Sequence, residues 1–467
     1  MALIVAATVV INYLVGIYYG LTNLIYTSLL TIALIIILRH IKRIKYSSFR
    51  EFSLSPQTPP ISILIPANNE EKNITASVSS ALGINYPFFE VIVIDDGSTD
   101  STLQNLINAF DLKKIDLIYR DVIKTAPVKT FYYNPQLPNL LIISKEKGGK
   151  ADALNCGINI CHSPYFCSVD ADSVLERDAL LRLIMPILES GKRIIACGGV
   201  VRALNGSEVI NGAVEKVNLP RTILALLQIV EYLRAFLFGR VGLDALNATL
   251  ILSGTFSLFD KQAVIEVNGF STDTVTEDME LIVRLHRKQV EKERPYQIKF
   301  ISDPVCWTEV PEKLSLLGRQ RRRWHLGLIQ SVLKHKIMLL NPKYGALGLF
   351  VMPYYFFVEM LSPIVEVFGY IIVIGCYFLH VISLEFFLLF LTLAIFYGTF
   401  LSTASIFLEE LTYRRYPLWR HLFTLLLFGI LENFGYRQVN SVWRMQAFFN
   451  YIIGRREWEY VRGGSRS

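Results

Sequence analysis

The sequence predicts an α/β domain with a mostly parallel sheet, flanked at both ends by apolar helical segments. Four short apolar runs alternate with helical patterns between residues 61 and 170, as in βαβ units. Mean hydropathy is +0.38 and 52% of the 467 residues are apolar, which is high for a soluble protein. The excess lies in Ala2 to Leu38 and in Ala346 to Tyr451, so we expect a soluble domain held between membrane segments.

The chain divides into five expected segments. These are a membrane anchor over 1–46, a linker over 47–60, an α/β domain with interfacial helices over 61–345, a membrane region over 346–454 and a basic tail over 455–467. The run Leu21 to Leu38 leads directly into Arg39 and Lys42, whereas a signal peptide carries its charge before the apolar run. We interpret this run as an uncleaved anchor, and Met1 to Tyr19 as either a second span or an interfacial helix.

Basic clusters lie beside the apolar segments. They are Arg39 to Arg43, Arg319 to Arg323, Arg414-Arg415 and Arg455-Arg456. The positive-inside rule then predicts an integral membrane protein with a cytoplasmic α/β domain that contacts membrane lipids. We expect the membrane to be the inner membrane of a bacterial or archaeal cell. The net charge is +7, but no stripe of interleaved basic and aromatic residues is present, so we exclude a nucleic-acid partner.

The C-terminal apolar region contains segments of different length. Ala346 to His380, interrupted by Pro363, is expected to form an interfacial or re-entrant piece followed by a span. Glu385 to Leu408 returns to the cytoplasm, while His421 to Tyr436 and Ala447 to Ile453 form a hairpin or lie at the interface. Within these apolar runs lie Glu359, Glu366 and Glu432. They either face a protein-lined cavity or pack against Arg or Tyr.

Four apolar runs are the expected parallel strands: Ile61 to Pro66, Glu90 to Ile94, Leu140 to Ile143 and Pro164 to Val169. Polar residues follow each run. They are Asn69 and Glu70 after Pro66, then Asp95 and Asp96, then Lys147 and Lys150, and last Asp170 and Asp172. Because the carboxyl ends of parallel strands meet at one edge, we expect these side chains to lie together. Carboxylates can accept from a base and a ribose, lysine can meet phosphate, and a carboxylate pair can hold Mg²⁺ or Mn²⁺.

Local signals around these strands carry further expectations. A helix is expected to start at Ala67 to Glu71 with Asn68 or Asn69 as its cap. The amides of Gly148-Gly149 either approach phosphate or form an ordinary turn. The insert Asp111 to Asn139, with three prolines, is expected to be a surface excursion.

Two alternative functions lack their motifs. No Gly-x-x-x-x-Gly-Lys-Ser/Thr and no Gly-x-Gly-x-x-Gly is present, which argues against an ATPase and a Rossmann dehydrogenase. The six cysteines form no Cys-x-x-Cys pair, so reduced thiols are expected.

The second half of the domain continues the same pattern. Arg177 to Leu188 is expected to be helical and Arg193 to Arg202 to be a strand. Leu219 to Phe238 suits a helix along the membrane surface. Ile251 to Phe259 is expected to be a strand that turns at Gly254.

Two later motifs each allow two interpretations. Thr276-Glu277-Asp278 either caps a helix over Met279 to Lys288 or supplies a carboxylate base. Gln320-Arg321-Arg322-Arg323-Trp324 is either a basic juxtamembrane helix or a site that pairs guanidinium groups with a diphosphate and places Trp324 against a sugar.

Taken together, these motifs resemble a known family. Asp95-Asp96-Gly97-Ser98, Asp170-Ala171-Asp172, Thr276-Glu277-Asp278 and Gln320 to Trp324, in this order and followed by membrane spans, are similar to the family-2 membrane glycosyltransferases. That family includes the synthases of hyaluronan, chitin, cellulose and poly-N-acetylglucosamine. The resemblance covers about Ile61 to Trp324 and implies the GT-A fold.

The resemblance also implies roles for the residues at the motif positions. Asp96 would bind the uridine of a nucleotide sugar, with Asp95 supporting its loop, and Pro66, Asn69 and Glu70 would lie beside the nucleotide. Asp170 and Asp172 would hold the diphosphate through Mg²⁺ or Mn²⁺, with Asp172 as the direct ligand, and Lys150 would meet phosphate or sugar. Where many relatives have an aromatic residue or His, this chain has Asn68, so base stacking is not expected there.

The catalytic and acceptor roles follow in the same way. Asp278, with Glu277 beside it, would be the general base of an inverting displacement that makes a β-linkage from an α-linked donor. Ser253 and Gly254 would lie beside the acceptor's terminal sugar, and Trp324 would line the acceptor site. Gln320, Arg322 and Arg323 would close on the diphosphate.

The resemblance predicts an inverting, metal-dependent transferase that adds sugar from UDP-GlcNAc or UDP-glucose to a growing polysaccharide, coupled to export and served by an accessory subunit. Two alternatives stay open. One is transfer of a single sugar to a membrane lipid acceptor, and the other is a nucleotide-sugar-binding assembly subunit without turnover. The second should have lost Asp172, Asp278 or Trp324, and all three are present.

Overall fold

The computed structural model describes residues 2–44, 58–210, 212–416 and 418–454. Most of the expected linker and the whole expected tail lie outside these residues. The chain forms two compact units. Among the described residues, the helical unit comprises 2–41, 219–248, 311–416 and 418–454, and the sheet unit comprises 42–44, 58–210, 212–218 and 249–310.

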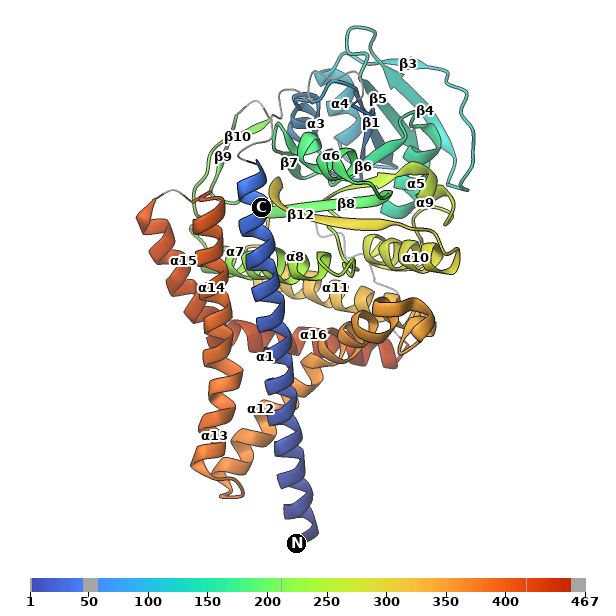
Figure 1. Cartoon of the computed structure of the whole chain (residues 1–467). Coiled ribbons are helices and arrows are strands. Elements are labelled where there is room, and N and C mark those ends of the chain that lie inside the picture. Colours follow the sequence, from blue (N-terminus) through green and yellow to red (C-terminus); the bar gives the residue numbers. More distant parts are fainter. Residues whose placement is uncertain (1, 45–57, 211, 417, 455–467) are drawn as a thin grey trace. The chain divides into compact units, whose positions relative to one another are not determined.

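The sheet unit is built on one large mixed sheet (Figure 1). Its strands, among the described residues, run in the order β3-β4-β5-β2-β1-β6-β11-β8-β12-β7. In chain order they are β1 Ile61–Ala67, β2 Phe89–Asp96, β3 Lys113–Ile115, β4 Val128–Tyr133, β5 Leu140–Lys145, β6 Tyr165–Val169, β7 Ser173–Leu175, β8 Ile194–Ala203, β11 Phe256–Asp260 and β12 Gln297–Thr308. A separate hairpin pairs β9 Glu208–Ile210 with β10 Ala213–Lys216.

The four expected parallel strands are confirmed as neighbours at the centre of this sheet. β5, β2, β1 and β6 pair in parallel, with Leu64 opposite Ile92 of β2 and Ser168 of β6. Ile63, Leu64 and Ile65 are fully buried, which explains why these strands read as continuous apolar runs. Their carboxyl ends therefore open at one edge of the sheet, and the predicted α/β architecture is confirmed.

The helices of the sheet unit connect these strands. They are α3 Ile74–Leu82, α4 Thr102–Ala109, α5 Lys150–Ile160, α6 Ala179–Glu189, α9 Lys261–Ile265 and α10 Glu277–Glu291. The first α helix after β1 was predicted too early, because α3 starts at Ile74. The amides of Asn69 and Glu70 donate instead to Ser98 Oγ and Thr102 Oγ1, so the segment after β1 is held by the loop after β2.

The insert between α4 and β5 was wrongly expected to lie only on the surface. β4 pairs antiparallel with β5, and β3 pairs with β4, so the insert extends the sheet. Its aromatic side chains Phe131 and Tyr132 are buried, whereas Pro127 and Pro135 lie outside the strand, where a missing amide is harmless.

The expected strand from Ile251 is shorter than predicted. β11 begins at Phe256, and Ile251 to Thr255 form no strand. In this segment Ser257 Oγ donates to Ser253 O at 2.7 Å and accepts from Ser253 N at 3.2 Å. The Ser257 hydroxyl therefore bonds to both backbone groups of Ser253, which would otherwise pair with a neighbouring strand.

His286 lies fully buried on α10. Its Nε2 donates to Thr249 O at 3.1 Å, so Nδ1 accepts from the Tyr296 hydroxyl at 2.7 Å. This arrangement uses the neutral imidazole, and burial lowers the pKa of His286 from 6.5 to about 4.

We expect this histidine to make the sheet unit less stable in mild acid. Between pH 6.5 and pH 4 the unfolded state binds the proton and the folded state does not, so the free energy of unfolding falls by up to about 3 kcal/mol as pH falls through this window. Thermal melting of the purified protein at pH 7.5 and pH 5 measures the effect. A His286→Gln variant should lose less melting temperature over that interval, and an equal loss would contradict the assignment.

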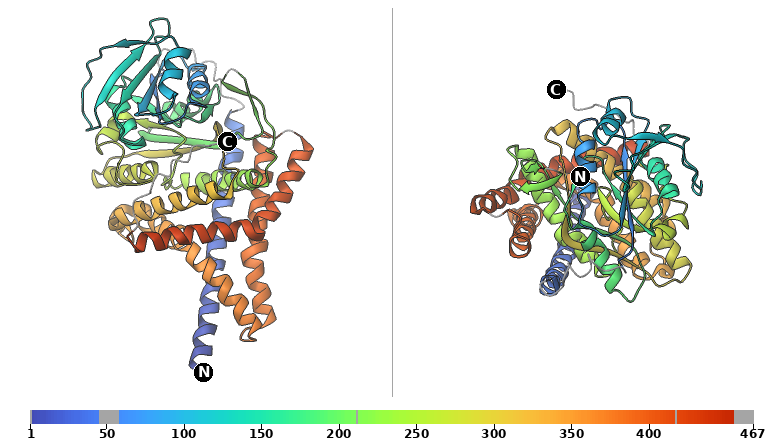
Figure 2. Two further views of the ribbon diagram at one scale, coloured as in Figure 1. Left: turned by 180° about the vertical axis from the view of Figure 1, so that it is seen from behind. Right: turned by 90° about the horizontal axis from the view of Figure 1, so that it is seen from above.

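The helical unit contains the long apolar helices. Its α helices are α1 Ala2–Ile44, α7 Ile223–Arg234, α8 Val241–Asp244, α11 Leu314–Lys334, α12 Ser362–Phe378, α13 Leu384–Leu391, α14 Tyr397–Thr412, α15 Trp419–Leu431 and α16 Arg437–Ile452. Short 3-10 turns (η2 Lys336–Met338, η3 Pro342–Tyr344) and π-helical stretches join them (η1 Ala235–Arg240, η4 Leu347–Val351, η5 Tyr354–Met360, η6 Thr392–Phe396, η7 Glu432–Tyr436). Figure 2 shows α11 and α16 running side by side.

Two helices in the described part of the chain are long and apolar enough to cross a membrane. They cover Ala7–Arg39 and Leu384–Thr412. A third candidate is the pair Leu347–Met360 and Ser362–Phe378, bent by 43° at a short break. The N-terminal apolar residues thus form one continuous helix rather than two segments, and the expected break before Pro363 is present.

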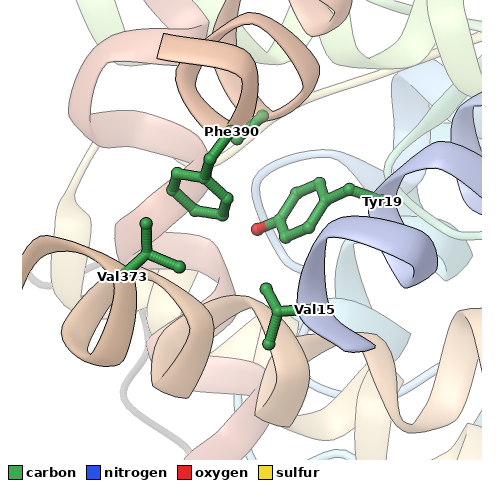
Figure 3. Packing of buried hydrophobic residues seen from close by; sticks show 5 residues of the cluster. Val15, Tyr19, Val373 and Phe390 are labelled. Atoms are coloured by element: carbon green, nitrogen blue, oxygen red, sulfur yellow. The ribbon is translucent and has the colours of Figure 1, made fainter. Parts of the chain in front are cut away.

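α1 packs against the C-terminal helices through a small apolar cluster (Figure 3). Val15 and Tyr19 of α1 point toward Val373 of α12 and Phe390 of α13. The rings of Tyr19 and Phe390 meet edge to face with centroids 5.3 Å apart. The anchor and the C-terminal helices are therefore parts of one packed bundle.

The acidic residues inside the apolar runs have protein partners. Glu432 is fully buried and pairs with Arg234 at 2.7 Å. Glu359 accepts from Tyr354 and lies 3.6 Å from Arg444, while Glu366 accepts from Ser441. For Glu359 and Glu432 the interpretation as packing against Arg or Tyr is confirmed.

Candidate active site

The carboxyl end of β2 supplies two buried aspartates. Asp95 accepts from Ser98 N at 3.2 Å and from Ser144 Oγ at 3.3 Å. Asp96 Oδ1 accepts from Lys145 Nζ and Gly148 N, both at 2.8 Å, and Asp96 Oδ2 accepts from Gly149 N at 2.7 Å. Asp95 therefore braces its own loop, and Asp96 joins β2 to the start of α5.

The turn at Gly148 and Gly149 serves Asp96, so its two amides are not directed at phosphate. Gly149 has φ +92°, a backbone conformation that suits glycine. A Cβ at Gly148 would lie 2.3 Å from Asp152 Oδ1, so only glycine fits there. Of the two interpretations of this dipeptide, the turn is confirmed.

Lys150 brings three segments together. Its Nζ lies 2.6 Å from Asp170 Oδ1 and 3.3 Å from Glu277 Oε1, and it donates to Gly254 O at 3.2 Å. Burial would lower the pKa of Lys150, but Asp170 and Glu277 raise it well above its usual range. The ammonium group is therefore a fixed positive charge at the ends of β6 and α10.

The acidic side of the site lies beside this ammonium group. Burial first and Asp170 second raise the pKa of Asp172, while Lys150 partly opposes the rise. Burial also raises the pKa of Glu70 to about 7, and Asp172 and Asp170 add to that shift. The carboxylates of Glu70, Asp170 and Asp172 therefore carry more negative charge than the single Lys150 ammonium group can neutralise.

This donor set fits a divalent cation held jointly with a substrate. Asp170 and Asp172 offer carboxylate oxygens, the ligands that Mg²⁺ and Mn²⁺ prefer. Burial first and repulsion from Asp170 second raise the pKa of Asp172, so a bound cation would be favoured there. In the described residues no group of three or more His, Cys, Asp and Glu side chains is arranged around one point. Mg²⁺ is usually bound by one or two carboxylates together with substrate phosphates, and the pair Asp170 and Asp172 fits that pattern.

Asp278 lies in the first turn of α10, directly against Gly254. A Cβ at Gly254 would be 2.9 Å from Asp278 Oδ2 and 3.7 Å from Lys150 Nζ. Thr276 holds the N-cap position, but its side chain makes no capping hydrogen bond. The hydrogen bond that the capping interpretation predicts for Thr276 is therefore missing. The carboxylates of Glu277 and Asp278 lie near Lys150 instead.

Under the role that the resemblance implies for Asp278, Gly254→Ala is expected to lower activity by at least about tenfold, because the added methyl group displaces the Asp278 carboxylate and a small misplacement of a reacting group is costly. Activity and melting temperature should be measured together. Gly191→Ala is a matched control, since no atom lies within 4 Å of its added Cβ. Full activity in Gly254→Ala would show that this close contact does not matter.

Matches to family models decide the family. A model described as glycosyl transferase family 2 matches residues 62–267, and one described as glycosyl transferase family group 2 matches residues 165–401, which is more than half of the chain. The chain belongs to glycosyl transferase family group 2. Its α/β unit is thus the GT-A domain that the motifs imply.

Curated relatives of this family-2 chain include two polysaccharide synthases. It is 30% identical over 269 residues to the poly-β-1,6-N-acetyl-D-glucosamine synthase of Staphylococcus aureus, covering 57% of this chain and 54% of the relative. Over 272 residues it is 30% identical to the enzyme of the same name from Staphylococcus epidermidis, covering 58% and 55%. The chain therefore spans about half the length of the curated relatives it matches.

Solved structures resemble this family-2 chain more distantly. A mannosyltransferase from Pyrobaculum calidifontis in complex with GDP-mannose and Mn²⁺ has a TM-score of 0.48 at 17% identity, covering 89% of this chain and 99% of that one. The TarS protein of S. aureus in complex with UDP-GlcNAc has a TM-score of 0.38 at 14% identity, covering 81% and 92%.

The structure brings the predicted residues of the family-2 sheet unit to one edge. These are Pro66, Asn69, Glu70, Asp95, Asp96, Lys150, Asp170, Asp172, Ser253, Gly254, Glu277 and Asp278. The other four predicted residues, Gln320, Arg322, Arg323 and Trp324, lie on α11 of the helical unit.

On α11 the motif is organised by a buried arginine. Arg321 Nη2 donates to Glu231 Oε2 at 2.9 Å, and its guanidinium lies 4.4 Å from the centroid of the Trp324 ring. Gln320, Arg323 and Trp324 share one face of the helix, because three and four residues make about one turn. Arg322 points elsewhere and donates to Gln446 on α16 at 3.3 Å.

Sequence reasoning missed three residues that hold this family-2 site together. Asn155 donates to Phe270 O at 2.9 Å and accepts from Phe270 N at 2.7 Å, which fixes the segment before α10. Lys145 forms an ion pair with Asp96 and a second ion pair with Asp152. One indication of these contacts is present in the sequence, which is that Lys145 ends the otherwise apolar strand β5.

Proposed function

We propose that this chain is an inverting glycosyltransferase that moves a sugar from a UDP-sugar to a growing polysaccharide at the membrane. The observation that carries the proposal is the placement of Asp278 against Gly254, beside the Lys150, Asp170 and Glu277 cluster. A carboxylate base thus lies next to a fixed positive charge at the strand ends, as transfer from a nucleoside diphosphate requires.

The chemistry is a single displacement. An acceptor hydroxyl oxygen attacks the anomeric carbon of the donor, its proton passes to the Asp278 carboxylate, and the bond from that carbon to the diphosphate oxygen breaks. The bonding pair leaves with the diphosphate, whose added charge the Lys150 ammonium group stabilises. Asp170 and Asp172 would hold a divalent cation, which would supply Lewis-acid stabilisation to the same leaving group. Glu277 keeps Lys150 in place.

The donor assignment rests on Asp96 and on the relatives. Asp96 would accept from the uracil ring, with Asn69 and Glu70 near the nucleotide and Pro66, the next-to-last residue of β1, beside them. The curated relatives are named as poly-β-1,6-N-acetyl-D-glucosamine synthases, which supports UDP-GlcNAc ahead of UDP-glucose.

We assign Ser253 and Gly254 of the sheet unit to the acceptor side, and the resemblance implies an acceptor role for Trp324 of the helical unit as well. Trp324 is 37% exposed, and Arg321 holds its ring, so it offers a surface on which a sugar can stack. Gln320 and Arg323, on the same helix face, would close on the diphosphate, and Arg322 would take part less directly because it already contacts Gln446.

Export of the product is part of the proposal. Polar side chains on the apolar helices of the helical unit support export, because such residues often mark a transport path. Gln438 donates to Tyr370 at 3.1 Å, and Ser441 donates to Glu366. The cytoplasmic side for the sheet unit follows from the basic clusters beside the spans. An accessory subunit stays a prediction.

A vesicle assay tests the function. Membrane vesicles that carry the protein are supplied with labelled UDP-GlcNAc, UDP-glucose or GDP-mannose and with Mg²⁺ or Mn²⁺, and the product is analysed by size and by organic extraction. We expect large, glycosidase-sensitive material from UDP-GlcNAc. A product in the lipid phase that carries one sugar would establish the lipid acceptor instead. Nucleotide-sugar binding without any product would indicate the assembly subunit.

A further inference from the structure

Lys145 is a buried lysine whose charge the proposed reaction does not use. It is the last residue of β5, and its side chain has no solvent exposure. Its Nζ lies 2.8 Å from Asp96 Oδ1 and 2.5 Å from Asp152 Oδ1, and it donates to Glu146 O at 2.6 Å. Burial would lower the pKa of Lys145, but hydrogen bonds to Asp152 and Asp96 outweigh it and raise the pKa. The ammonium group is therefore a permanent donor behind Asp96.

Asp152 fixes this lysine from the other side. It lies in the first turn of α5, where a carboxylate is favoured by the helix dipole, and both of its oxygens accept from Ala126 N, at 3.2 and 3.0 Å. Its carboxylate also occupies the space that a side chain at Gly148 would need. Lys145 thus has two anchored carboxylates as partners and little freedom to move.

The Asp96 carboxylate is surrounded by donors alone. Lys145 Nζ and Gly148 N point at Oδ1, and Gly149 N points at Oδ2. A carboxylate has about four acceptor positions, so roughly one on Oδ2 stays open. A ligand group that reaches this position must donate a hydrogen bond.

The same contacts connect the two ends of the site. Asp96 holds the amides of Gly148 and Gly149, and the next residue is Lys150, whose Nζ contacts Asp170 and Glu277. A shift of the Asp96 carboxylate would therefore move the start of α5 and with it the phosphate-facing ammonium group.

We propose that Lys145, anchored by Asp152, is a positioning residue that sets the Asp96 carboxylate so that it selects donors whose base presents a ring N–H. This rests on the proposed function. Uracil carries such an N–H at its N3 position, where cytosine has an acceptor nitrogen. Lys145 thereby acts on donor specificity through Asp96 without touching the donor.

Lys145→Met tests the proposal in vesicles of the full chain. The change keeps the length of the side chain and removes the donor, so Asp96 loses the contact that orients it. We expect KM for the UDP-sugar to rise by at least about tenfold, since a hydrogen bond to a charged group is worth about that factor or more. The preference for UDP over CDP as competing inhibitors should shrink by a similar factor. Lys145→Arg should restore part of both.

A second variant separates positioning from charge balance. Lys145→Met leaves two carboxylates without their cation, which can reduce stability on its own. Lys145→Met combined with Asp152→Asn returns the cluster to its original net charge, and Asn can still accept from Ala126 N. We expect this double variant to regain melting temperature while KM and the UDP to CDP ratio stay altered.

The matched control is Lys292→Met, which breaks a partly exposed Lys292–Glu266 pair at 2.7 Å elsewhere in the sheet unit and should leave KM unchanged. Wild-type KM in Lys145→Met, or full recovery of KM in the double variant, would overturn the positioning role. Absence of both transfer and nucleotide binding in the wild-type protein would instead overturn the proposed function.

Discussion

Asp278→Asn is expected to reduce the turnover number of sugar transfer by about a thousandfold, the contribution of a positioned general base. Asn has the same size, so it keeps the contact with Gly254, but its amide cannot accept the proton of the acceptor hydroxyl. Vesicle assays at saturating donor measure the loss, and binding of UDP-sugar should stay close to the wild-type value.

The control for this variant is Glu291→Gln, at the other end of α10, where Glu291 pairs with Arg287 at 2.8 Å on a partly exposed surface. We expect it to leave turnover within about twofold, because such pairs contribute little. If Asp278→Asn binds donor and turns over like the control, another group must take the proton.

Asp172→Asn should reduce activity by at least about a hundredfold and raise the Mg²⁺ or Mn²⁺ concentration needed for half-maximal rate. The change removes one of the two carboxylates proposed to bind the cation. A bound cation contributes several kcal/mol of transition-state stabilisation. Chelation with EDTA should abolish transfer by the wild-type protein, and added Mn²⁺ or Mg²⁺ should restore it.

Asp178→Asn is the matched control for that change. Asp178 precedes α6 and pairs with Arg182 at 2.7 Å, so its substitution alters a charge six residues away from Asp172 without entering the strand ends. Its metal requirement should equal that of the wild type. A wild-type metal response in Asp172→Asn would remove this carboxylate from the cation site.

The central sheet could be predicted because its signal is local. β1, β2, β5 and β6 are buried on both faces, so each is a continuous apolar run followed by polar residues. Parallel pairing then brings the polar ends together without further information. For this reason the positions of Asp95, Asp96, Lys150, Asp170 and Asp172 at one edge followed from the sequence.

Other features depend on contacts between distant segments, which local patterns do not contain. α3 starts later than predicted because the amides of Asn69 and Glu70 donate to Ser98 and Thr102, some thirty residues further along the chain. β4 joins the sheet because Phe131 and Tyr132 find a buried surface, although the prolines around them indicated a loop. The partners of Asp96 are equally non-local, so neither Lys145 nor Asp152 could be assigned from the sequence.

The stacking of Arg321 on Trp324 has an entropic consequence. A free tryptophan side chain loses rotational freedom when a ligand stacks on it, and that loss weakens binding. Here the guanidinium, itself anchored by Glu231, has already restricted the ring within α11. An acceptor that stacks on Trp324, as we propose, would therefore meet an already ordered ring and would cost less side-chain freedom on binding.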